Sequence, residues 1–459
     1  MHDKIREFLY NRFIEPTKAE RQHYVGIEIE MPVINLNKEA VDFDVIQKIT
    51  ALFIEHFGFD IAARDDEGMI YSTADKITSD TLSYDCSYNN LELSLGCSVE
   101  LNTIYSRFKK YYSFLQTELG KYNYTLTGMG INPYRIYNNN VPIQNGRYRM
   151  LFHHLSSYDD YTLPMYFHHY PDFGLYSSAS QVQLDVDYEN IAETINTFGK
   201  LEPIKSLLFS NSPLNDETVN LLCSRDMFWE NSTHGINPHN IGMFDCEFSN
   251  SDEILDYIES CSLYCTDRDG KYINFPPVPV TEYFKKEKIT GEYFADGEYH
   301  SIEIKPELSD LLYLRTFKFE DLTFRGTIEY RSVCCQPISD CMASAAFHLG
   351  ISEKLHEVTA LIESDKILYG HGFSKTELRK LFNAGTIPDL INEDDLYCLA
   401  KSIVDLSRDG LISRGYGEEK FLEPLYERIR NRTNPATRIE EHLKNSKDIV
   451  ELIKEYSIL

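Results

Sequence analysis

The fold class of this protein is decided by the strand-like stretch Tyr24-Val25-Gly26-Ile27-Glu28-Ile29-Glu30. Branched apolar residues alternate with glutamates in this stretch, and a period of two predicts a β-strand. Successive side chains of a strand point to opposite faces, so Glu28 and Glu30 share one face and the apolar residues share the other. The rise per residue places the two carboxylates about 7 Å apart along that face.

Polar side chains between apolar strand residues recur at Glu92, at Glu329 and over Gln181–Asp185. For any single strand of this kind, a solvated face is the alternative interpretation. Several acidic strands that converge on a common space would repel one another unless a cation lay between them. Carboxylate and amide oxygens suit magnesium or manganese better than zinc. The recurrence therefore favours a hard-metal site on a sheet.

The periodicity changes along the chain. Strand-like segments up to about residue 335 are Tyr24–Glu30, Asn90–Leu95, Gln181–Asp187, Gly270–Phe275, His300–Ile304 and Leu322–Arg331. Helical periodicity covers residues 43–57 and 98–121 and, after Pro337, residues 339–349, 352–363, 374–382, 394–405 and 418–430. This order predicts an α+β fold with a helical C-terminal region. Since no linker or repeat interrupts the chain, we expect one domain over 1–459, sheet-rich over 1–335 and mostly helical over 336–459.

Composition and charge restrict the class of partner. The 459 residues include 45 Lys and Arg against 72 Asp and Glu, a formal charge of −27. No basic run is present, so we expect no nucleic-acid partner. The chain has no apolar stretch of membrane-spanning length, and its first residues are charged, so we expect a cytoplasmic protein without a membrane partner. The ten cysteines form no Cys-x-x-Cys motif, which favours free thiols.

A series of short motifs then occurs in a fixed order. They are Gly-x-Glu-x-Glu at 26–30, Leu-Glu-Leu-Ser at 91–94, Gly-Met-Gly-x-x-Pro at 128–133, Gly-Arg-Tyr at 146–148, Gln-Val-x-Leu-Asp at 181–185, Asn-Ser-Pro at 211–213, Ser-Arg-x-x-x-Trp at 224–229, Lys-Tyr-Ile at 271–273, Glu-x-Arg at 329–331 and Arg-Gly-Tyr at 414–416. Each motif alone is weak, but their order and spacing are specific. Together they resemble the plant and proteobacterial glutamate–cysteine ligases.

The resemblance implies a curved antiparallel β-sheet funnel flanked by helices, of the type found in glutamine synthetase and guanidino kinases. It also implies ATP and two or three Mg²⁺ ions, or Mn²⁺, at one end of the funnel, and amino-acid and amine substrates at the other. The implied metal ligands are Glu28, Glu30, Glu92, Glu329 and Gln181. A monomer or homodimer is expected.

The resemblance assigns further roles to cationic residues. Arg331, together with Glu329, is expected to be catalytic, and Arg331 lies near the phosphates. Arg147 and Lys271 are expected to contact the nucleotide, and Arg225 the amino-acid substrate. No phosphate-binding P-loop or dinucleotide-binding glycine motif is present, so any ATP binds on the sheet.

The expected reaction is the ATP-dependent joining of a carboxylate to an amine through an acyl phosphate, most simply glutamate to cysteine. Three residues depart from the family pattern and are expected to contact the amino acids, namely Tyr176, Gln183 and Ser332. These departures leave open a different acid or amine, as in a natural-product pathway. Two further hypotheses are a non-catalytic or regulatory relative and a phosphotransferase that stops after phosphorylation.

Overall fold

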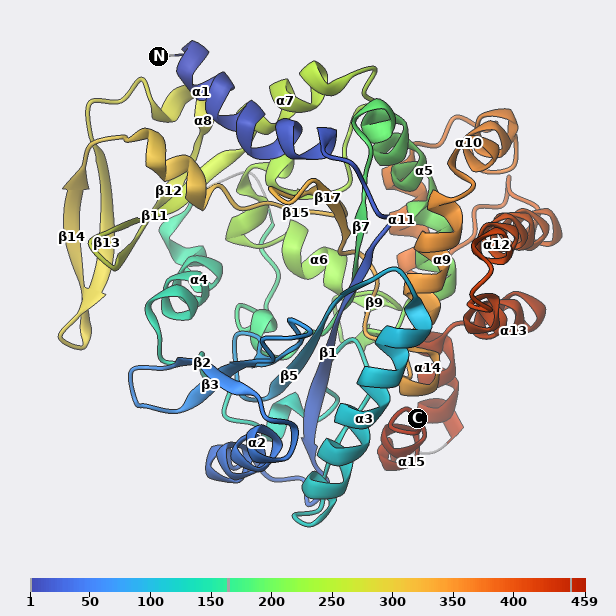
Figure 1. Ribbon diagram of the computed structural model, residues 1–459, viewed down its shortest axis with the longest axis horizontal. Helices are drawn as coiled ribbons and strands as arrows, with labels where there is room; N and C mark the ends of the chain where they lie inside the picture. The colour runs from blue at the N-terminus through green and yellow to red at the C-terminus, as the bar shows by residue number, and fades with distance from the viewer. Residues whose placement is uncertain (1, 163–165, 446–447) are drawn as a thin grey trace.

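The computed structural model describes residues 2–162, 166–445 and 448–459. Within that part of the chain, nine strands form one antiparallel sheet in the order β16-β17-β7-β1-β5-β4-β3-β2, with β6 paired to the end of β1. The strands are β1 (Val25–Asn35), β2 (Asp60–Arg64), β3 (Ile70–Ala74), β4 (Thr81–Tyr84), β5 (Asn90–Ser98), β6 (Tyr124–Leu126), β7 (Ser180–Asp185), β16 (Glu320–Leu322) and β17 (Thr327–Tyr330). β2 and β3 lie across the direction of β1, so the sheet is strongly twisted (Figure 1).

The register of the sheet places its polar residues on one face, in neighbouring rows. Residues directly opposite one another in a sheet project from the same face. Glu30 pairs with Glu92 of β5, and Glu28 pairs with Gln181 of β7. At the other side of β7, Glu329 pairs with Gln183. The alternation expected from sequence is therefore continued across neighbouring strands, and one face of the sheet becomes polar over most of its width.

Helices cover the apolar face of the sheet. The helix α2 (Phe43–Phe57) has the bounds expected from sequence, because the Asp42 side chain accepts a hydrogen bond from Asp44 N at 2.9 Å at one end and Gly58 adopts φ 73° at the other. The helix α3 (Leu101–Gly120) contacts β5, and α9 (Ala343–Ser352) contacts β1 and β7. The opposite, polar face of the sheet lines a cavity.

The region after Pro337 is helical, as expected. Its helices are α9, α10 (Leu355–Ser364), α11 (Lys375–Asn383), α12 (Glu393–Arg414), α13 (Glu423–Asn431), α14 (Pro435–Asn445) and α15 (Val450–Glu455). They lie together along one side of the molecule (Figure 1). The main hydrophobic cluster contains residues of both this region and the strand-rich region, from Ile5 to Ile429.

A second antiparallel sheet of four strands lies at the opposite side of the molecule (Figure 1). It consists of β11 (Ser262–Arg268), β12 (Lys271–Pro279), β13 (Ile289–Ala295) and β14 (Glu298–Ile304). The helices of the strand-rich region, besides α2 and α3, are α1 (His2–Leu9), α4 (Gly146–Ser156), α5 (Ile191–Phe209), α6 (Arg225–Glu230), α7 (Ser251–Ser260) and α8 (Val280–Tyr283). The short strand pairs are β8 (Leu214–Asn215) with β9 (Asn220–Leu221), and β10 (Ile241–Gly242) with β15 (Phe317–Lys318).

Two global expectations can be compared with the structure directly. All ten cysteines are free, as expected, and seven of them are buried. In the described ranges, no helix combines the length and the apolar character that a membrane crossing requires.

Candidate active site

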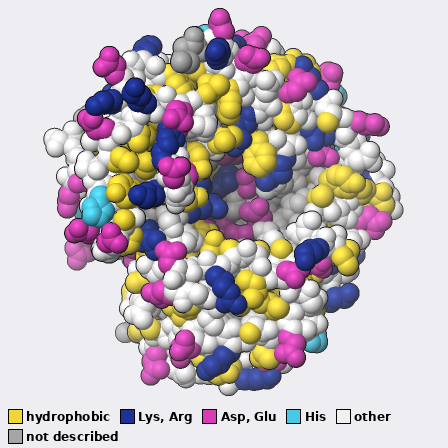
Figure 2. All heavy atoms as spheres, turned by 60° about the vertical axis from the view of Figure 1, so that its left-hand side comes forward, with side chains coloured by type: hydrophobic (Ala, Val, Ile, Leu, Met, Phe, Trp, Pro, Cys, Tyr) yellow, Lys and Arg dark blue, Asp and Glu magenta, His cyan; other side chains and the backbone are white. Residues whose placement is uncertain are grey.

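A cavity of about 670 Å³ lies over the polar face of the sheet. Its walls come from α4, α6, α7 and β11, together with the N-terminal segment and the chain that leads into β16. Figure 2 shows a hollow in which Lys and Arg side chains gather beside Asp and Glu, with hydrophobic side chains on its rim. The cavity is therefore both strongly charged and partly apolar.

All five expected metal ligands line this cavity from four strands, namely Glu28 and Glu30 of β1, Glu92 of β5, Gln181 of β7 and Glu329 of β17. Glu30 is only 5% exposed and accepts hydrogen bonds from Ala179 N at 2.7 Å and from Gln181 Nε2 at 2.8 Å. Glu92 accepts from the hydroxyls of Ser83 and Ser94. The carboxylates are thus held by neighbouring donors rather than solvated.

Burial and mutual repulsion disfavour the charged form of these carboxylates. Burial, then the neighbouring Glu92 and Glu329, raise the pKa of Glu28 well above its usual range. Burial and the nearby Asp85 raise the pKa of Glu30 to about 8. Buried carboxylates that repel one another gain stability when a cation binds among them.

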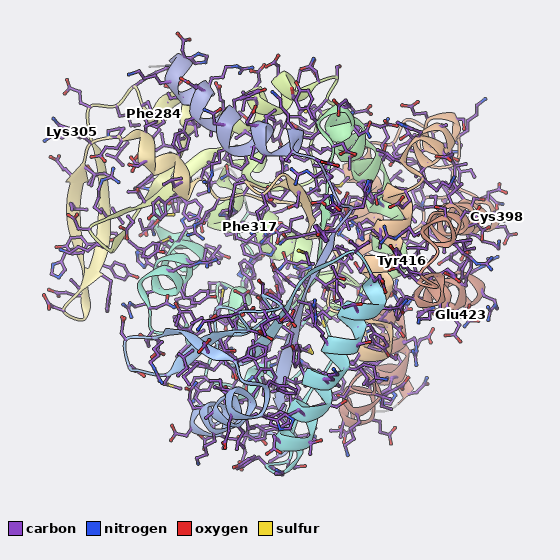
Figure 3. All side chains as sticks on the ribbon, in the orientation of Figure 1. Phe284, Lys305, Phe317, Cys398, Tyr416 and Glu423 are labelled. Carbon is purple, nitrogen blue, oxygen red and sulfur yellow. The ribbon has the colours of Figure 1, made fainter. Side chains whose placement is uncertain are left out.

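Arg331 brings positive charge to the same place. Its guanidinium lies 3.0 Å from Glu329 Oε2 and 4.9 Å from the ring centroid of Phe317, on which Trp229 stacks at 4.1 Å. Phe317 lies near the centre of the molecule (Figure 3). Burial opposes the charge of Arg331, but attraction to Glu329 and Asp321 outweighs it and raises the pKa of Arg331.

Two further expected arginines also line the cavity, Arg225 and Arg147. Arg225 begins α6 and donates to the carbonyls of Ser332 and Val333 at 3.4 and 3.3 Å, which ties α6 to the end of β17. Arg147, in the first turn of α4, is exposed. Since both guanidiniums face the cavity, they are available to an anionic ligand.

The structure adds cavity residues that the sequence analysis missed. Asp85 follows β4, and burial raises its pKa. Asp321 pairs in register with Glu329 across β16 and β17, and burial raises its pKa to about 6. Neither stands in an alternating strand pattern as clear as that of Glu28.

Cationic residues were also missed. Arg12, Arg315 and Arg325 line the cavity, and Arg12 is about 300 residues away in sequence from Leu312, whose carbonyl accepts its hydrogen bond. Arg325 donates to Gln183 Oε1 at 2.7 Å. Single arginines in helices and turns carry no pattern, so nothing in the sequence pointed to them.

The side chains fit a magnesium ion only together with further ligands. Gln181 Oε1 is buried beside Glu30 and has no hydrogen-bond partner, as expected of an oxygen reserved for a cation. Within the described ranges, however, no three acidic, histidine or cysteine side chains stand close enough to hold an ion unaided. Magnesium commonly takes one or two carboxylates and completes its shell with water and substrate phosphates. The donor set fits that mode of binding.

Two of the expected substrate contacts are corrected by the structure. Ser332 is 3% exposed, is absent from the cavity lining, and donates to Glu202 Oε1 at 2.9 Å. Strand alternation explains this, because Ser332 follows Arg331 and points to the opposite side. Tyr176 is also buried outside the lining, with Phe228 at 6.2 Å and the Arg135 guanidinium at 5.6 Å from its ring.

The structure also changes the roles expected for Gln183 and Lys271. Gln183 donates to Glu28 Oε1 at 3.1 Å and to Glu329 Oε1 at 3.4 Å, so it holds the carboxylates together and is not part of the cavity lining. Lys271 does not reach the cavity. It begins β12 at an exposed hairpin turn, and its ammonium lies 4.6 Å from the Tyr293 ring centroid. The hairpin directs this side chain to the second sheet.

The correction for Ser332 gives a testable prediction. Ser332→Ala should lower the free energy of unfolding by about 1–3 kcal/mol, because it removes one hydrogen bond to the buried carboxylate of Glu202, whose Oε1 then keeps only Lys205 as a donor. It should leave the preference among amine substrates unchanged. Urea denaturation and competition between amines measure the two effects. Ser94→Ala is the matched control on the cavity face, since Ser94 donates to Glu92 at 2.6 Å. A changed amine preference in Ser332→Ala alone would contradict the correction.

Comparison with known proteins supplies relatives but no family model, since none matches. Curated sequences named as chloroplastic glutamate–cysteine ligases are similar over much of the chain. The Nicotiana tabacum enzyme is 25% identical over 313 residues, which cover 66% of this chain and 54% of the relative. The Solanum lycopersicum enzyme is 24% identical over 320 residues, with the same two coverages. This chain is similar to glutamate–cysteine ligases.

The resemblance inferred from the short motifs is thereby confirmed. The chain spans about half the length of the glutamate–cysteine ligases that it matches. Among solved structures, a glutamate–cysteine ligase from Francisella tularensis in complex with AMP aligns with a TM-score of 0.49 at 13% identity, covering 96% of this chain and 89% of that one.

Proposed function

We propose that this protein is an ATP-dependent carboxylate–amine ligase that joins the γ-carboxylate of glutamate to cysteine. The observation that carries the proposal is the cavity in which buried and half-buried carboxylates from three strands lie beside Arg331 and other guanidiniums. A site of this kind suits phosphoryl transfer, in which metal ions and arginines offset the charge of anionic reactants. The similarity to glutamate–cysteine ligases supports the same reaction.

The chemistry follows from the weak electrophilicity of a carboxylate. The substrate carboxylate attacks the γ-phosphorus of ATP and the bond to the β-phosphate oxygen breaks, which gives an acyl phosphate and ADP. The amine then attacks the acyl carbon and inorganic phosphate leaves, with loss of a proton from the amine. No nucleophile of the protein takes part. The residues of the chain bind the two anions, orient them and keep water away.

Each part of the cavity has a role in that scheme. Glu28, Glu30, Glu92 and Glu329 and the free oxygen of Gln181 would hold magnesium, which when bound would offset the charge of the phosphates. Arg331 supplies a planar fork for the transferred phosphoryl group. Arg225 offers positive charge to the carboxylate groups of the amino acids, as expected from the resemblance, and we assign Arg147 to the same groups instead of to the nucleotide.

Cysteine is the acceptor that we infer among the possible amines. The departures from the family pattern at Tyr176 and Ser332 suggest an altered amino-acid site, but both side chains are buried away from the cavity. Gln183 contacts the carboxylates of Glu28 and Glu329 instead. These departures therefore give no reason to expect another acceptor. The cytoplasmic location expected from sequence stays a prediction, and the matched relatives are named as chloroplastic.

The proposal is tested by product analysis. The protein is incubated with ATP, magnesium, glutamate and a panel of amines, and the products are identified by mass spectrometry. We expect γ-glutamylcysteine, ADP and phosphate in equal amounts. ADP release with glutamate but no amine would indicate a phosphotransferase. An amide formed only with another acid or amine would keep the chemistry and change the substrates, and no ADP under any condition would overturn the proposal.

Arg331 gives a separate prediction for this reaction. Arg331→Lys should lower kcat by about tenfold or more, since an ammonium keeps the charge but not the two-pronged geometry of a guanidinium. Arg331 is positioned for this by its contact with Glu329 and by the Phe317 ring. Steady-state rates at saturating ATP and magnesium measure the effect. A loss below about threefold would show that only the charge of Arg331 matters.

A further inference from the structure

A second cavity, of about 330 Å³, lies in the helical C-terminal region. Its walls come from α13, the connection to α14, the start of α14 and the turn that ends at Asp340. Figure 1 shows α13 and α14 below α12. Among the described residues, none lines both this helical cavity and the cavity over the sheet. The proposed reaction therefore leaves the helical cavity without a role.

The lining of the helical cavity combines both signs of charge. Arg428 and Arg438 supply two guanidiniums, and Asp340 and Glu427 supply two carboxylates. A ligand that carries charge of one sign would be repelled by half of these groups. A molecule with one positive and one negative group finds an opposite charge for each of them. The balance of the lining therefore favours a zwitterion over a simple anion or cation.

Arg428 is a buried member of this charged set, with only 6% of its surface exposed. Its Nη2 donates to Asp340 Oδ2 at 2.7 Å. Burial lowers the pKa of Arg428 by more than the attraction of Asp340 raises it, and the charge of Arg438 lowers it further. A carboxylate bound close to the two arginines would favour their charged forms. The guanidiniums are thus suited to the anionic group of a ligand.

Hydrogen bonds behind Arg428 fix this wall of the cavity in place. Its Nη1 donates to the carbonyl of Leu208 at 3.0 Å and to Gln336 Oε1 at 2.7 Å. Gln336 is fully buried and donates to the carbonyl of Cys334 at 2.9 Å, and Cys334 forms a β-bridge with Ala179 next to β7. The wall is therefore attached to the main sheet before any ligand binds, which reduces the ordering cost of binding.

We propose that the helical cavity is a binding site for a small zwitterion of the free amino acid class, separate from the cavity over the sheet. The carboxylate of the ligand lies at Arg438, and its ammonium group lies at Glu427 and Asp340. Asn431 and Thr433 also line the cavity and offer an amide and a hydroxyl to a polar side chain of the ligand. A volume of about 330 Å³ is at the lower end of the range for small-molecule sites, which suits a ligand of this size.

The test is calorimetry on the full chain without ATP, so its result does not depend on the proposed reaction. The probe is L-glutamine, whose side chain ends in an amide and lacks the carboxylate that the reaction would activate. Two further probes share its skeleton and remove one charge each, namely glutaramate, without the ammonium group, and 4-aminobutanamide, without the carboxylate. We expect L-glutamine to bind and each of the other two to bind at least about tenfold more weakly, the scale of one charged hydrogen bond.

Two variants of the lining test the assigned contacts. Arg438→Ala should weaken binding of L-glutamine about tenfold, and Glu427→Gln should reduce the preference for L-glutamine over glutaramate. Both side chains are exposed, so both variants should fold, which circular dichroism melting checks. Arg430→Ala is the matched control, since Arg430 is an exposed arginine of α13 that lies 3.7 Å from Glu423 and outside the lining. It should leave the affinity unchanged.

Arg225→Ala, in the cavity over the sheet, locates the bound probe. It should leave the affinity for L-glutamine unchanged, because Arg225 does not line the helical cavity. Loss of L-glutamine binding in Arg225→Ala, or unchanged binding in Arg438→Ala, would overturn the site. Glutaramate that binds as tightly as L-glutamine would show an anion site and contradict the zwitterion. No binding of L-glutamine to the wild-type protein would also overturn the proposal.

Discussion

Glu28→Gln is expected to lower kcat at saturating magnesium by a hundredfold to a thousandfold, the scale on which loss of one charge-stabilising group reduces catalysis. Glu28 lines the cavity beside Glu92 and Glu329, and the change removes a negative charge from the proposed metal site without removing volume. The fold should persist, because the amide oxygen can still accept from Gln183 Nε2, which lies 3.1 Å from Glu28 Oε1. Glu329→Gln should behave similarly.

The rate of ADP release measures the loss of kcat, and circular dichroism melting measures whether the fold persists. Glu303→Gln is the matched control, since Glu303 is a strand glutamate of β14 that pairs with Lys288 at the surface. It should keep wild-type activity. Turnover close to wild type in both Glu28→Gln and Glu329→Gln would show that these carboxylates hold no catalytic cation.

Arg379→Met is expected to lower the free energy of unfolding by about 3–5 kcal/mol, as is typical when one partner of a buried ion pair is removed. Arg379, in α11, is 3% exposed. It binds Asp226 through Nε and NH2 at 2.6 and 3.1 Å and also contacts the buried Glu202. The substitution would leave two acidic groups without their shared cation.

Urea denaturation followed by fluorescence measures the loss. Arg379→Lys should fall between wild type and Arg379→Met, because it keeps the charge but not the fork. Arg432→Met is the surface control, since Arg432 pairs with Asp394 and Glu393 in an exposed position, and it should change stability little. If Arg379→Met lowered the free energy of unfolding as little as Arg432→Met does, the buried network would add nothing to stability.

The buried ion pairs of Arg379 with Asp226 and Glu202 also connect the helical C-terminal region to the cavity. Asp226 follows Arg225 in α6, and Arg225 faces the cavity. Ser332, next to Arg331, donates to Glu202 in the same network. The periodicity of α11 predicted a helix near residues 374–382, but a helical pattern does not show which buried carboxylate an arginine will meet. That partner depends on how α11 packs against α5 and α6.

Several elements were predictable because their signals are local. Alternation in Tyr24–Glu30 predicted β1, and the Asp42 cap and Gly58 delimit α2 at the residues where its periodicity begins and ends. The four glutamates were identified because each stands between apolar strand residues. Tyr176 and Lys271 lie outside the cavity lining, because a motif match places a backbone position but does not fix the cavity toward which its side chain points.

What the sequence by itself determined is the α+β class, the helical C-terminal region, the resemblance to glutamate–cysteine ligases and the glutamates that share a strand face. These follow from the period of the polypeptide backbone, which acts over a few residues. The tertiary structure alone decided that Arg12 meets Phe324, that Asp321 lies opposite Glu329 and that Ser332 points to Glu202. Such contacts join residues that strand register and helix packing bring together, and no local period encodes them.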